Sequence, residues 1–428
     1  MKNIGIGIVG IGNIGSYLYK EINSKKNEIY KNLGFKINIL GVSAKNFKKK
    51  RSIKLNKKLF FKNPINLAKD KKINILFELI GMSDGISKKV VETALKNKKH
   101  VITANKALIS KHGEYLSKVA EKNNVNLEFE ASVGGGIPVL RTIKDGLATN
   151  KISKVIGILN GTSNYILSEM EKTKKSFNDV LIKSQKLGLA EANPKFDLDG
   201  SDVLSKVKIL SSLAFKKKIS TNSCLKNGIE NIDLKDIEMA NNLNLRIKLL
   251  GITEIINNQL FERVHPSLVP KDNYVANING AMNAVILNGS PVGESVLQGE
   301  GAGPGPTSSA LMSDLLSILR GNIKYPFGIP YNKRIKINSY NSDFYENSLY
   351  LRLVVKDKPG VLSDITRNLA KFKISIERLI QIPDKKNKKA TIVIITHKCL
   401  EKNSLSCIKS LNKNKSILKN PVLIRLFK

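Results

Sequence analysis

Acidic side chains and one lysine are concentrated between residues 191 and 206 of this chain. The acidic residues are Glu191, Asp197, Asp199 and Asp202. Apolar positions at helical spacing begin just after residue 201, and at about 100° per residue they place Lys206 roughly 60° and Lys208 roughly 140° from the centre of the apolar stripe. Lys206 is therefore predicted to lie at the rim of the core beside Asp202, whereas Lys208 is predicted to be an ordinary solvent-exposed lysine.

Carboxylates that lie this close together in the sequence need a cation or an ammonium group to balance their charge. Four carboxylates in a short span suggest a divalent metal ion, because hard cations prefer oxygen ligands. The same carboxylates could instead bind the ammonium group of a ligand and support that of Lys206. This segment alone leaves both interpretations open.

A glycine-rich turn near the N-terminus indicates a nucleotide cofactor. Residues 3–9 are predicted to form a buried strand, and a helix is expected from Ser16 onward. The glycines between them have the spacing that lets the backbone turn tightly, approach a pyrophosphate and pack the helix against the strand. The residues expected to contact the cofactor are Gly10, Ile11, Gly12, Asn13, Ile14 and Gly15.

The end of the second predicted strand bears on the choice of cofactor. Residues 42–45 contain no acidic residue that would bind a ribose 2′-hydroxyl. Basic residues follow instead, namely Lys45, Lys49, Lys50 and Arg51. NADP is therefore favoured over NAD, which stays possible.

Two polar segments fall at predicted helix starts. Residues 103–106 (Thr-Ala-Asn-Lys) follow the fourth predicted strand at the carboxyl edge, where open α/β sheets bind ligands. The alternative is a helix N-cap followed by a solvent lysine. Residues 160–164 (Asn-Gly-Thr-Ser-Asn) supply small hydrogen-bonding groups, and a helix N-cap is a sufficient interpretation for them.

Two glycine-rich segments could bring backbone close to a ligand. Residues 130–138 combine Glu130 with three successive glycines, which suits carbonyl oxygens around a hard monovalent cation or a hinge between domains. From the sequence alone the hinge is favoured. Residues 299–309 are rich in glycine and proline and lead into an apolar helix predicted over 309–319, so their backbone can approach a ligand closely.

Composition argues against several classes of partner. The net charge of +37 comes from 62 lysines but only 10 arginines, spread along the chain without tryptophan, so a nucleic-acid surface is not expected. No apolar run approaches the length that spans a bilayer, no targeting segment is predicted, and a soluble cytoplasmic protein is expected. Neither the three cysteines (Cys224, Cys399 and Cys407) nor the four histidines have the spacing of a metal site.

The order of the predicted elements indicates an α/β fold. Predicted strands at 3–9, 37–42, 74–79, 100–103 and 125–130 alternate with helices such as 85–97 and 110–123, which predicts a doubly wound, Rossmann-type parallel sheet. An α+β domain is expected from 131, with helices over 162–171, 176–187 and 202–215. Polar residues 339–347 are predicted to be a linker to a small domain at 348–428.

Taken together, the motifs resemble those of homoserine dehydrogenase, in order and spacing, over residues 1 to about 335. They are Gly10-x-Gly12-x-x-Gly15, Thr103-Ala-Asn-Lys106, the segment from Glu130 to Pro138, Ile158 to Asn164, Glu191-Ala-Asn-Pro, Asp202-x-x-x-Lys206 and the loop from Gly301 to Thr307. The tail, with Asp357-Lys-Pro-Gly-Val-Leu, is similar to an ACT regulatory domain of βαββαβ order. By this resemblance, residues 1–130, completed by about 310–338, would be the dinucleotide-binding domain, and 131–309 the substrate-binding and dimerisation domain.

The resemblance implies reversible hydride transfer between NAD(P)H and L-aspartate 4-semialdehyde, giving L-homoserine in threonine, methionine and isoleucine biosynthesis. Lys206 would be the general acid, beside Asp202, and Lys106 would align substrate and nicotinamide. The substrate would contact Glu191, which binds its ammonium group, together with Asp197, Gly161 and Thr162. The cofactor would also contact Ser83, Lys106 and Gly303. A sodium ion would be bound by Glu130, Val133, Gly135 and Ile137.

The family likeness also implies assembly as a homodimer or homotetramer and feedback inhibition by threonine near Asp357, Pro359 and Gly360. Two positions depart from the family pattern: Asn193 replaces a usual aspartate, and Met82 a usual glycine. Two alternatives stay open, another NAD(P)-dependent oxidoreductase of the same fold, or a catalytically inactive amino-acid-sensing relic. A semialdehyde dehydrogenase would need a cysteine nucleophile, which no motif supplies.

Overall fold

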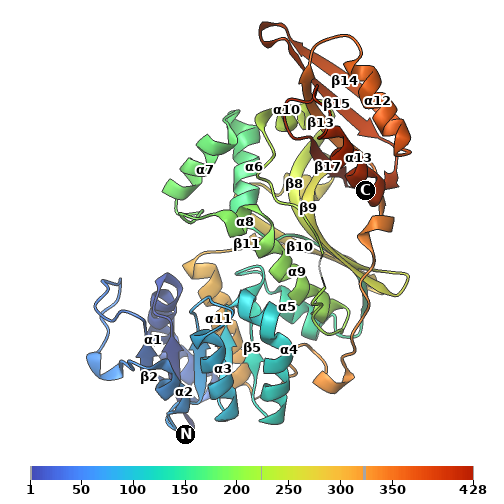
Figure 1. The fold of residues 1–428 in the computed structure, drawn as a ribbon. Helices are drawn as coiled ribbons and strands as arrows, with labels where there is room; N and C mark the ends of the chain where they lie inside the picture. Colours follow the sequence, from blue (N-terminus) through green and yellow to red (C-terminus); the bar gives the residue numbers. More distant parts are fainter. Residues whose placement is uncertain (1, 223, 322–323, 428) are drawn as a thin grey trace.

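The computed structural model describes residues 2–222, 224–321 and 324–427. Figure 1 shows the N-terminal part of the chain at one end of an elongated molecule, the C-terminal part at the other end, and residues of the middle of the chain between them. Among the described residues, none of the helices combines the length and apolar character needed to traverse a lipid bilayer.

The N-terminal part is a parallel sheet with helices on both faces, as predicted. Its strands run in the order β2 (Phe35–Ser43), β1 (Lys2–Val9), β3 (Ile75–Glu78), β4 (His100–Thr103) and β5 (Leu127–Glu128). The helices between them are α1 (Asn13–Leu33), α2 (Pro64–Lys69), α3 (Ile86–Lys96) and α4 (Lys106–Lys122). Helix α1 begins at Asn13 rather than at the predicted Ser16, because Gly12 is already its N-cap residue.

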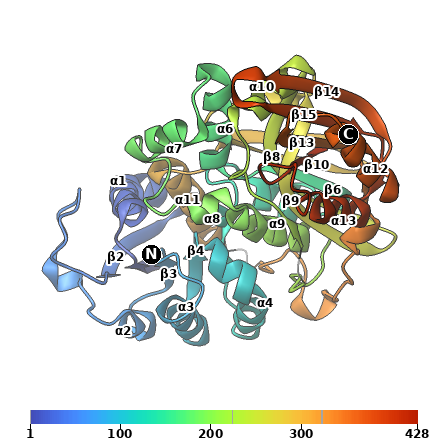
Figure 2. The same cartoon turned by 45° about the horizontal axis from the view of Figure 1, so that its top comes forward.

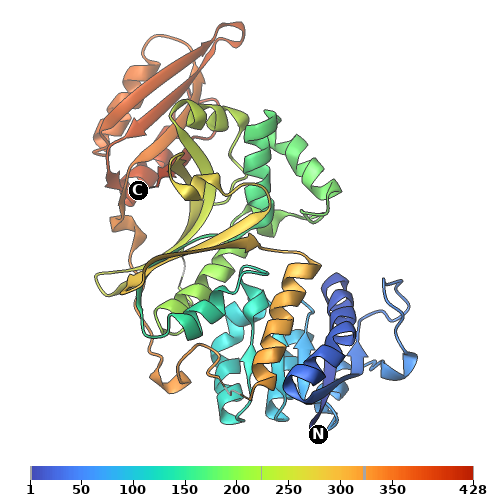
Figure 3. The same ribbon diagram turned by 180° about the vertical axis from the view of Figure 1, so that it is seen from behind.

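Alternate residues of each strand face opposite sides of this sheet. Leu76 and Val101 belong to the apolar cluster that includes residues of α2, α3 and α4. Phe77 and Ile102 belong to the cluster that includes residues of α1 and of α11 (Pro304–Leu319). Figure 3 shows α11 beside α1, although nearly the whole middle of the chain separates them in sequence. Residues 322 and 323, within the segment predicted to complete this domain, lie outside the described residues.

The middle of the chain is a mixed sheet with helices packed against it. Its strands are β6 (Lys151–Ile158), β7 (Leu225–Lys226), β8 (Leu245–Ile256), β9 (Gln259–Pro270), β10 (Met282–Ser290) and β11 (Gly293–Glu300). The helices are α5 (Val139–Arg141), α6 (Gly161–Thr173), α7 (Phe177–Lys186), α8 (Lys195–Leu198), α9 (Ser201–Ala214) and α10 (Leu234–Asn242). The predicted helices over 162–171, 176–187 and 202–215 thus correspond to α6, α7 and α9.

The C-terminal part has the predicted βαββαβ order. Its elements are β13 (Leu349–Lys356), α12 (Val361–Lys371), β14 (Ile376–Asp384), β15 (Lys389–Thr396), α13 (Glu401–Leu411) and β17 (Val422–Leu426). The sequence did not predict how this part joins the body: β17 pairs in parallel with β9, so one sheet continues in the order β11-β10-β6-β8-β9-β17-β13-β15-β14.

The segment predicted to be a linker is partly structured. Its residues Glu346 and Asn347 form β12, which pairs with β16 (Cys399–Leu400). Upstream of β12, the backbone N–H of Tyr340 donates to the carbonyl of Leu260 over 2.7 Å. Polar composition hid these contacts, because backbone hydrogen bonds to distant strands need no apolar periodicity.

Candidate active site

Lys206 lies inward on α9, as its helical position predicted. It is 7% exposed, and its Nζ donates to Oδ2 of Asp202 over 2.8 Å and to the main-chain carbonyl of Leu159. Lys208 differs from its prediction because it is half-buried rather than fully exposed. Its Nζ donates to the carbonyl of Asn222 over 3.3 Å.

A second lysine meets the same carboxylate from the other domain. Lys106 begins α4, and its Nζ lies 2.8 Å from Oδ1 of Asp202. Figure 2 shows α4 and α9 side by side at this junction. The predicted N-cap is confirmed, since the side chain of Asn105 accepts from the N–H of Leu108, but Lys106 is no free solvent lysine. Asp202 therefore bridges two ammonium groups from different domains.

Asn160, at the start of α6, contacts Asp202 and a second aspartate. Nδ2 of Asn160 donates to Oδ1 of Asp197 and to Oδ2 of Asp202, both over 2.8 Å. Oδ1 of Asn160 accepts from the N–H of Ser163, so the predicted N-cap is also present. The sequence did not reveal the contacts of the amide nitrogen, because the partners are about forty residues away along the chain.

Burial and charge set the protonation of these groups. Burial lowers the pKa of Lys206, and the neighbouring charge of Lys106 lowers it further, against the opposing effect of Asp202. Burial alone would raise the pKa of Asp202, but the charges of Lys206 and Lys106 hold it below its usual range. Burial also lowers the pKa of Lys106, yet Asp202 and the charges of Asp197 and Glu191 outweigh that effect and raise it. Lys206 is thus the ammonium group best prepared to release a proton.

The carboxylates of residues 191–202 do not gather around one point. Asp199 accepts from the N–H and the hydroxyl of Ser201 and forms an ion pair with Lys226 over 3.1 Å. Glu191 is exposed, and its carbonyl accepts from the side chain of Gln185. In the described part of the chain, no group of three or more His, Cys, Asp or Glu side chains could hold a metal ion. The arrangement fits ammonium partners better than a divalent ion.

The remaining substrate candidates adjoin the cluster at the start of α6. Gly161 is half-buried, and a Cβ there would come within 2.7 Å of the carbonyl of Ala281. Thr162 is buried, and its hydroxyl donates to the carbonyl of Leu189 over 2.7 Å. Thr162 therefore anchors the chain just before Glu191.

The glycine-rich turn has the geometry that its spacing predicted. A Cβ on Gly15 would meet the carbonyl oxygen of Gly10 at 2.1 Å, whereas nothing lies within 4 Å of the position of a Cβ on Gly12. Gly10 itself has φ +100°, a conformation that favours glycine. Gly15 thus permits close packing of α1, and Gly12 leaves space where a pyrophosphate could approach.

The other residues of the turn differ in exposure. Ile11 is buried among the apolar residues under α1 and α11, and Ile14 packs against the same cluster. Asn13 is exposed. Nε of Arg51 donates to the carbonyl of Ile11 over 2.9 Å, so the basic segment after β2 is fastened to the turn.

Two further cofactor candidates lie on neighbouring loops. Ser83 follows β3, is half-buried, and donates its hydroxyl to the carboxylate of Asp84. Gly303 precedes α11 as its N-cap residue with φ +115°. Both positions are compatible with the predicted role, and neither carries a contact that only a cofactor would explain.

One buried carboxylate at the carboxyl edge of the sheet was not singled out from the sequence. Glu78 ends β3 with 0% exposure and accepts from the hydroxyls of Ser87 and Thr103 and from the N–H of Ile80. It thereby fixes the loop that carries Ser83 and the segment that leads to Lys106. The feature of the sequence that could have identified Glu78 is its position as the acidic last residue of an otherwise apolar strand.

The candidate cation site is a tightly packed turn between the domains. The carboxylate of Glu130 accepts from the N–H groups of Leu140 and Arg141, each over 2.8 Å. The turn brings Gly135 so close to Gly301 that a Cβ on Gly135 would lie 2.5 Å from the carbonyl group of Gly301. Since the Glu130 carboxylate is committed to the start of α5, a cation here would be bound mainly by main-chain carbonyls.

The carbonyls of this turn are unequally engaged. That of Ile137 accepts from the N–H of Val139 over 2.8 Å, and that of Glu130 accepts from the N–H of Val133 over 3.3 Å. Glycines 134 and 135 have φ values of +76° and +57°, so the turn is a fixed left-handed conformation of glycine. Carbonyl oxygens are suitable ligands for a hard monovalent cation.

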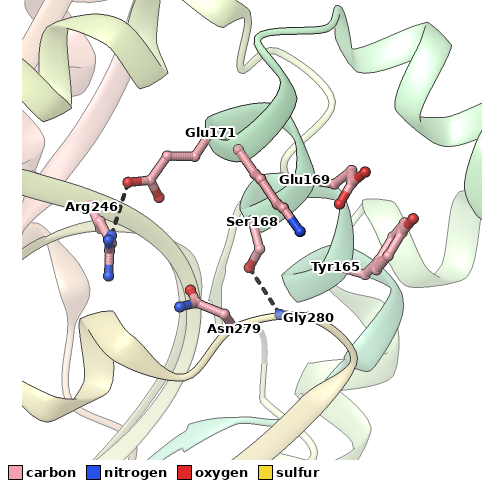
Figure 4. A pocket seen from close by; sticks show the side chains of 8 residues that line it. Tyr165, Ser168, Glu169, Glu171, Arg246, Asn279 and Gly280 are labelled. Atoms are coloured by element: carbon pink, nitrogen blue, oxygen red, sulfur yellow. Dashed lines mark hydrogen bonds and ion pairs between the residues drawn. The ribbon is translucent and has the colours of Figure 1, made fainter.

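A separate cavity lies farther along α6. It measures about 440 Å³ and is lined by Tyr165, Ser168, Glu169, Glu171, Lys172, Arg246, Asn279 and Gly280. Figure 4 shows the ion pair of Glu171 with Arg246 and the hydrogen bond from the N–H of Gly280 to Ser168. None of the residues of the Lys206 cluster lines this cavity, so the cavity is distinct from the candidate active site.

The thiols give no sign of a covalent mechanism. Burial and the charge of Glu262 raise the pKa of Cys224 to about 12, and burial raises the pKa of Cys407 to about 12. A thiol with a raised pKa is a poor nucleophile at neutral pH. The raised pKa values disfavour a cysteine-dependent semialdehyde dehydrogenase.

Comparison with protein families gives three matches along the chain. The NAD-binding domain of homoserine dehydrogenase matches residues 10–130, homoserine dehydrogenase matches residues 138–316, and the ACT domain matches residues 349–413. Among curated proteins, homoserine dehydrogenase of Neisseria gonorrhoeae is 38% identical over 100% of this chain and 99% of its own length. That of Bacillus subtilis is 35% identical over 96% of this chain and 95% of its own.

Solved structures agree with these matches. A homoserine dehydrogenase from Thiobacillus denitrificans superposes with a TM-score of 0.90 at 36% identity, covering 100% of this chain and 99% of that one. The enzyme from S. aureus gives a TM-score of 0.75 at 30% identity with the same coverage. The chain therefore belongs to the homoserine dehydrogenase family of oxidoreductases and carries an ACT domain after its catalytic body.

Proposed function

We propose that this protein catalyses the reversible NAD(P)-dependent reduction of L-aspartate 4-semialdehyde to L-homoserine, with Lys206 as the general acid. The observation that carries the proposal is the buried Lys206 ammonium, paired with Asp202 and lying at the junction of the two domains. When bound, the nicotinamide would supply the hydride. Lys206 would give its proton to the oxygen that becomes the hydroxyl, and in the reverse direction the neutral amine would remove that proton.

The other polar groups of the cluster would position the substrate. Asp197 and Glu191 would attract its ammonium group, since both add negative charge near Lys106. Lys106 would align the substrate with the nicotinamide because it reaches Asp202 from the cofactor domain. Gly161 and Thr162 would line the substrate pocket from the start of α6.

Purified protein would be assayed for homoserine oxidation with NADP and with NAD, followed by absorbance of the reduced nicotinamide. Turnover of homoserine with either cofactor supports the proposal, and no turnover with both cofactors over a range of salt concentrations would refute it. The same assay tests the cofactor preference. We expect NADP to be preferred, because no acidic residue ends β2 and the basic segment after β2 is held against the glycine-rich turn by the hydrogen bond from Arg51 to Ile11. An archaeal relative of the same fold, at 22% identity, has been solved as a mutant in complex with NADPH.

The cofactor contacts would come from the glycine-rich turn at residues 10–15, from Ser83 and Lys106, and from Gly303. The open space at Gly12 supports the approach of a pyrophosphate there. We further propose a sodium ion bound by Glu130, Val133, Gly135 and Ile137, through main-chain carbonyls. Replacing sodium by a bulky organic cation in the assay should lower activity if the ion supports the turn.

The ACT domain suggests regulation by an amino acid. We propose feedback inhibition by threonine, with Asp357, Pro359 and Gly360 near its site, and a homodimer or homotetramer as the active species. Calorimetry with threonine and light scattering of the purified protein test these two points. A flat calorimetric trace, or a monomer at assay concentration, would contradict them. The free thiols of Cys224, Cys399 and Cys407 support a reducing compartment such as the cytoplasm.

A further inference from the structure

Asn160 occupies an unusual position at the start of α6. It is 5% exposed and lies between the two aspartates that the proposed function assigns to the substrate and to the lysine acid. Its neighbour Leu159 provides the carbonyl that accepts from Lys206. The side chain of Asn160 thus contacts both aspartates, and the residue before it contacts Lys206.

All the polar atoms of the Asn160 amide are used. Oδ1 accepts from the N–H of Ser163 over 2.7 Å, and the two hydrogens of Nδ2 point to Asp197 and Asp202 over 2.8 Å each. The opposite orientation of the amide would place its oxygen against two carboxylates and its nitrogen against a backbone N–H. The network therefore fixes the orientation of the amide.

We propose that Asn160 is a positioning residue that tethers Asp197 to Asp202 and thereby holds the proposed ammonium-binding carboxylate in register with the carboxylate that supports Lys206. Helix capping by Asn160 requires only its oxygen, so the two N–H donations are independent of that role. This inference rests on the proposed function for the meaning of the two aspartates, but the tether itself rests on the hydrogen bonds.

Electrostatics make such a tether useful. The charge of Asp202 raises the pKa of Asp197, because two nearby carboxylates repel each other. Burial disfavours the ionised form of both side chains. Donation from Asn160 favours the ionised form of Asp197 and lowers its pKa, although burial prevails and leaves that pKa raised. The charged groups that also face the pair are Lys106 on α4, Lys206 on α9 and Glu191 before α8.

The Asn160→Ser variant separates the two roles of the side chain. Serine is a good N-cap and can still accept from the backbone, but its short hydroxyl cannot donate to both carboxylates. We expect a lower melting temperature than the wild type, because two carboxylates lose a buried donor, and kcat/KM for homoserine lowered about ten- to a hundredfold, as for the loss of hydrogen bonds to charged groups. The KM for the nicotinamide cofactor should not change, since Asn160 does not touch the glycine-rich turn.

A second readout distinguishes positioning from simple packing. Without the Asn160 donor, Asp197 should protonate more easily, so the acidic limb of the pH profile of kcat/KM should move to higher pH. Asn160→Asp keeps the cap and the shape but replaces two donations by repulsion, so it should lose more activity than Asn160→Ser. Ser176→Ala removes the N-cap of α7, away from the cluster, and controls for the effect of a weakened cap on activity.

The outcomes separate this inference from the proposed function. If the wild type oxidises homoserine, Lys206→Met abolishes that activity and Asn160→Ser matches the wild type in rate and pH profile, the inference is wrong and the function stands. If the wild type itself does not oxidise homoserine, the proposed function is wrong and the role assigned to the tether is wrong with it. A rate loss in Asn160→Ser with an unshifted profile and a raised cofactor KM would indicate general damage and would also overturn the inference.

Discussion

Replacing Lys206 by methionine should remove the proton donor and keep most of the packing of its stem. General acid catalysis by a positioned side chain contributes about 10²- to 10⁴-fold to the rate. Since each tenfold change corresponds to about 1.4 kcal/mol of activation free energy, the expected loss is about 3 to 5 kcal/mol. The loss should fall on kcat, while the affinity for the cofactor should stay close to that of the wild type.

We expect this variant to fold, because its neighbours keep other partners. Asp202 loses one ammonium partner but keeps Lys106 at 2.8 Å and the Asn160 amide at 2.8 Å. Losing one partner of a buried charge while others remain should cost about 1 to 3 kcal/mol of stability, less than leaving the charge wholly unpaired. A thermal melt of the variant, compared with the wild type, checks this point.

The assay is steady-state reduction of L-aspartate 4-semialdehyde over a range of pH, with a fluorescence titration of the reduced cofactor. Reduction needs protonated Lys206, so its rate should fall as pH rises through the lowered pKa of that residue, and the variant should lose this alkaline limb. Lys208→Met is the matched control, because it removes a lysine charge from the same helix without touching Asp202. A Lys206→Met rate within about threefold of the wild type would refute the assignment, since that change is far below the contribution expected of a general acid.

Other parts of the structure lead to three more predictions. Gly12→Ala should fold normally but weaken cofactor binding at least about tenfold, because its Cβ would occupy the space left for the pyrophosphate. Gly15→Ala should lower the melting temperature, because its Cβ would collide with the backbone of Gly10. Cofactor titration and thermal melts of both variants test this. Arg352→Leu should lower the free energy of unfolding by about 1 to 3 kcal/mol in urea denaturation, since the buried Asp236 on α10 loses its arginine but keeps the hydroxyl of Tyr350 and the N–H of Asp233; an unchanged midpoint would contradict it. Burial and neighbouring acids raise the pKa of Asp314, so its contribution to stability is present at low pH and is lost as pH rises through the folded-state pKa. Asp314→Asn should therefore reduce the fall in melting temperature that follows a rise in pH above about 4, the usual pKa of an aspartate, and an identical fall in both proteins would count against this.

The sequence predicted those features that depend on local spacing. The period of α9 correctly aimed Lys206 at the core, and the glycine spacing predicted the turn before α1. The N-cap interpretations of Asn105 and Asn160 are confirmed. In each case neighbours within one helical turn decide the outcome.

Features that depend on distant partners were out of reach. Lys208 is half-buried rather than exposed, and Glu262, from β9, is among the charged groups near it. The sequence left Lys106 open to interpretation as a solvent lysine, because its partner Asp202 lies on α9, far away along the chain. The second use of Asn160, and the pairing of β17 with β9, join segments whose proximity no periodicity encodes.

The position of α11 has a consequence for how the chain matures during synthesis. The strands of the parallel sheet are complete once residue 128 has been made, yet the face that α11 covers with Leu311 and Leu315 stays open until residues 304–319 leave the ribosome. During that interval the nascent chain carries an uncovered apolar surface beside α1. A truncated gene product that ends after β5 would keep this surface permanently, so expression of residues 1–130 alone should give an aggregating fragment, whereas joining it to α11 through a short linker should give a soluble one.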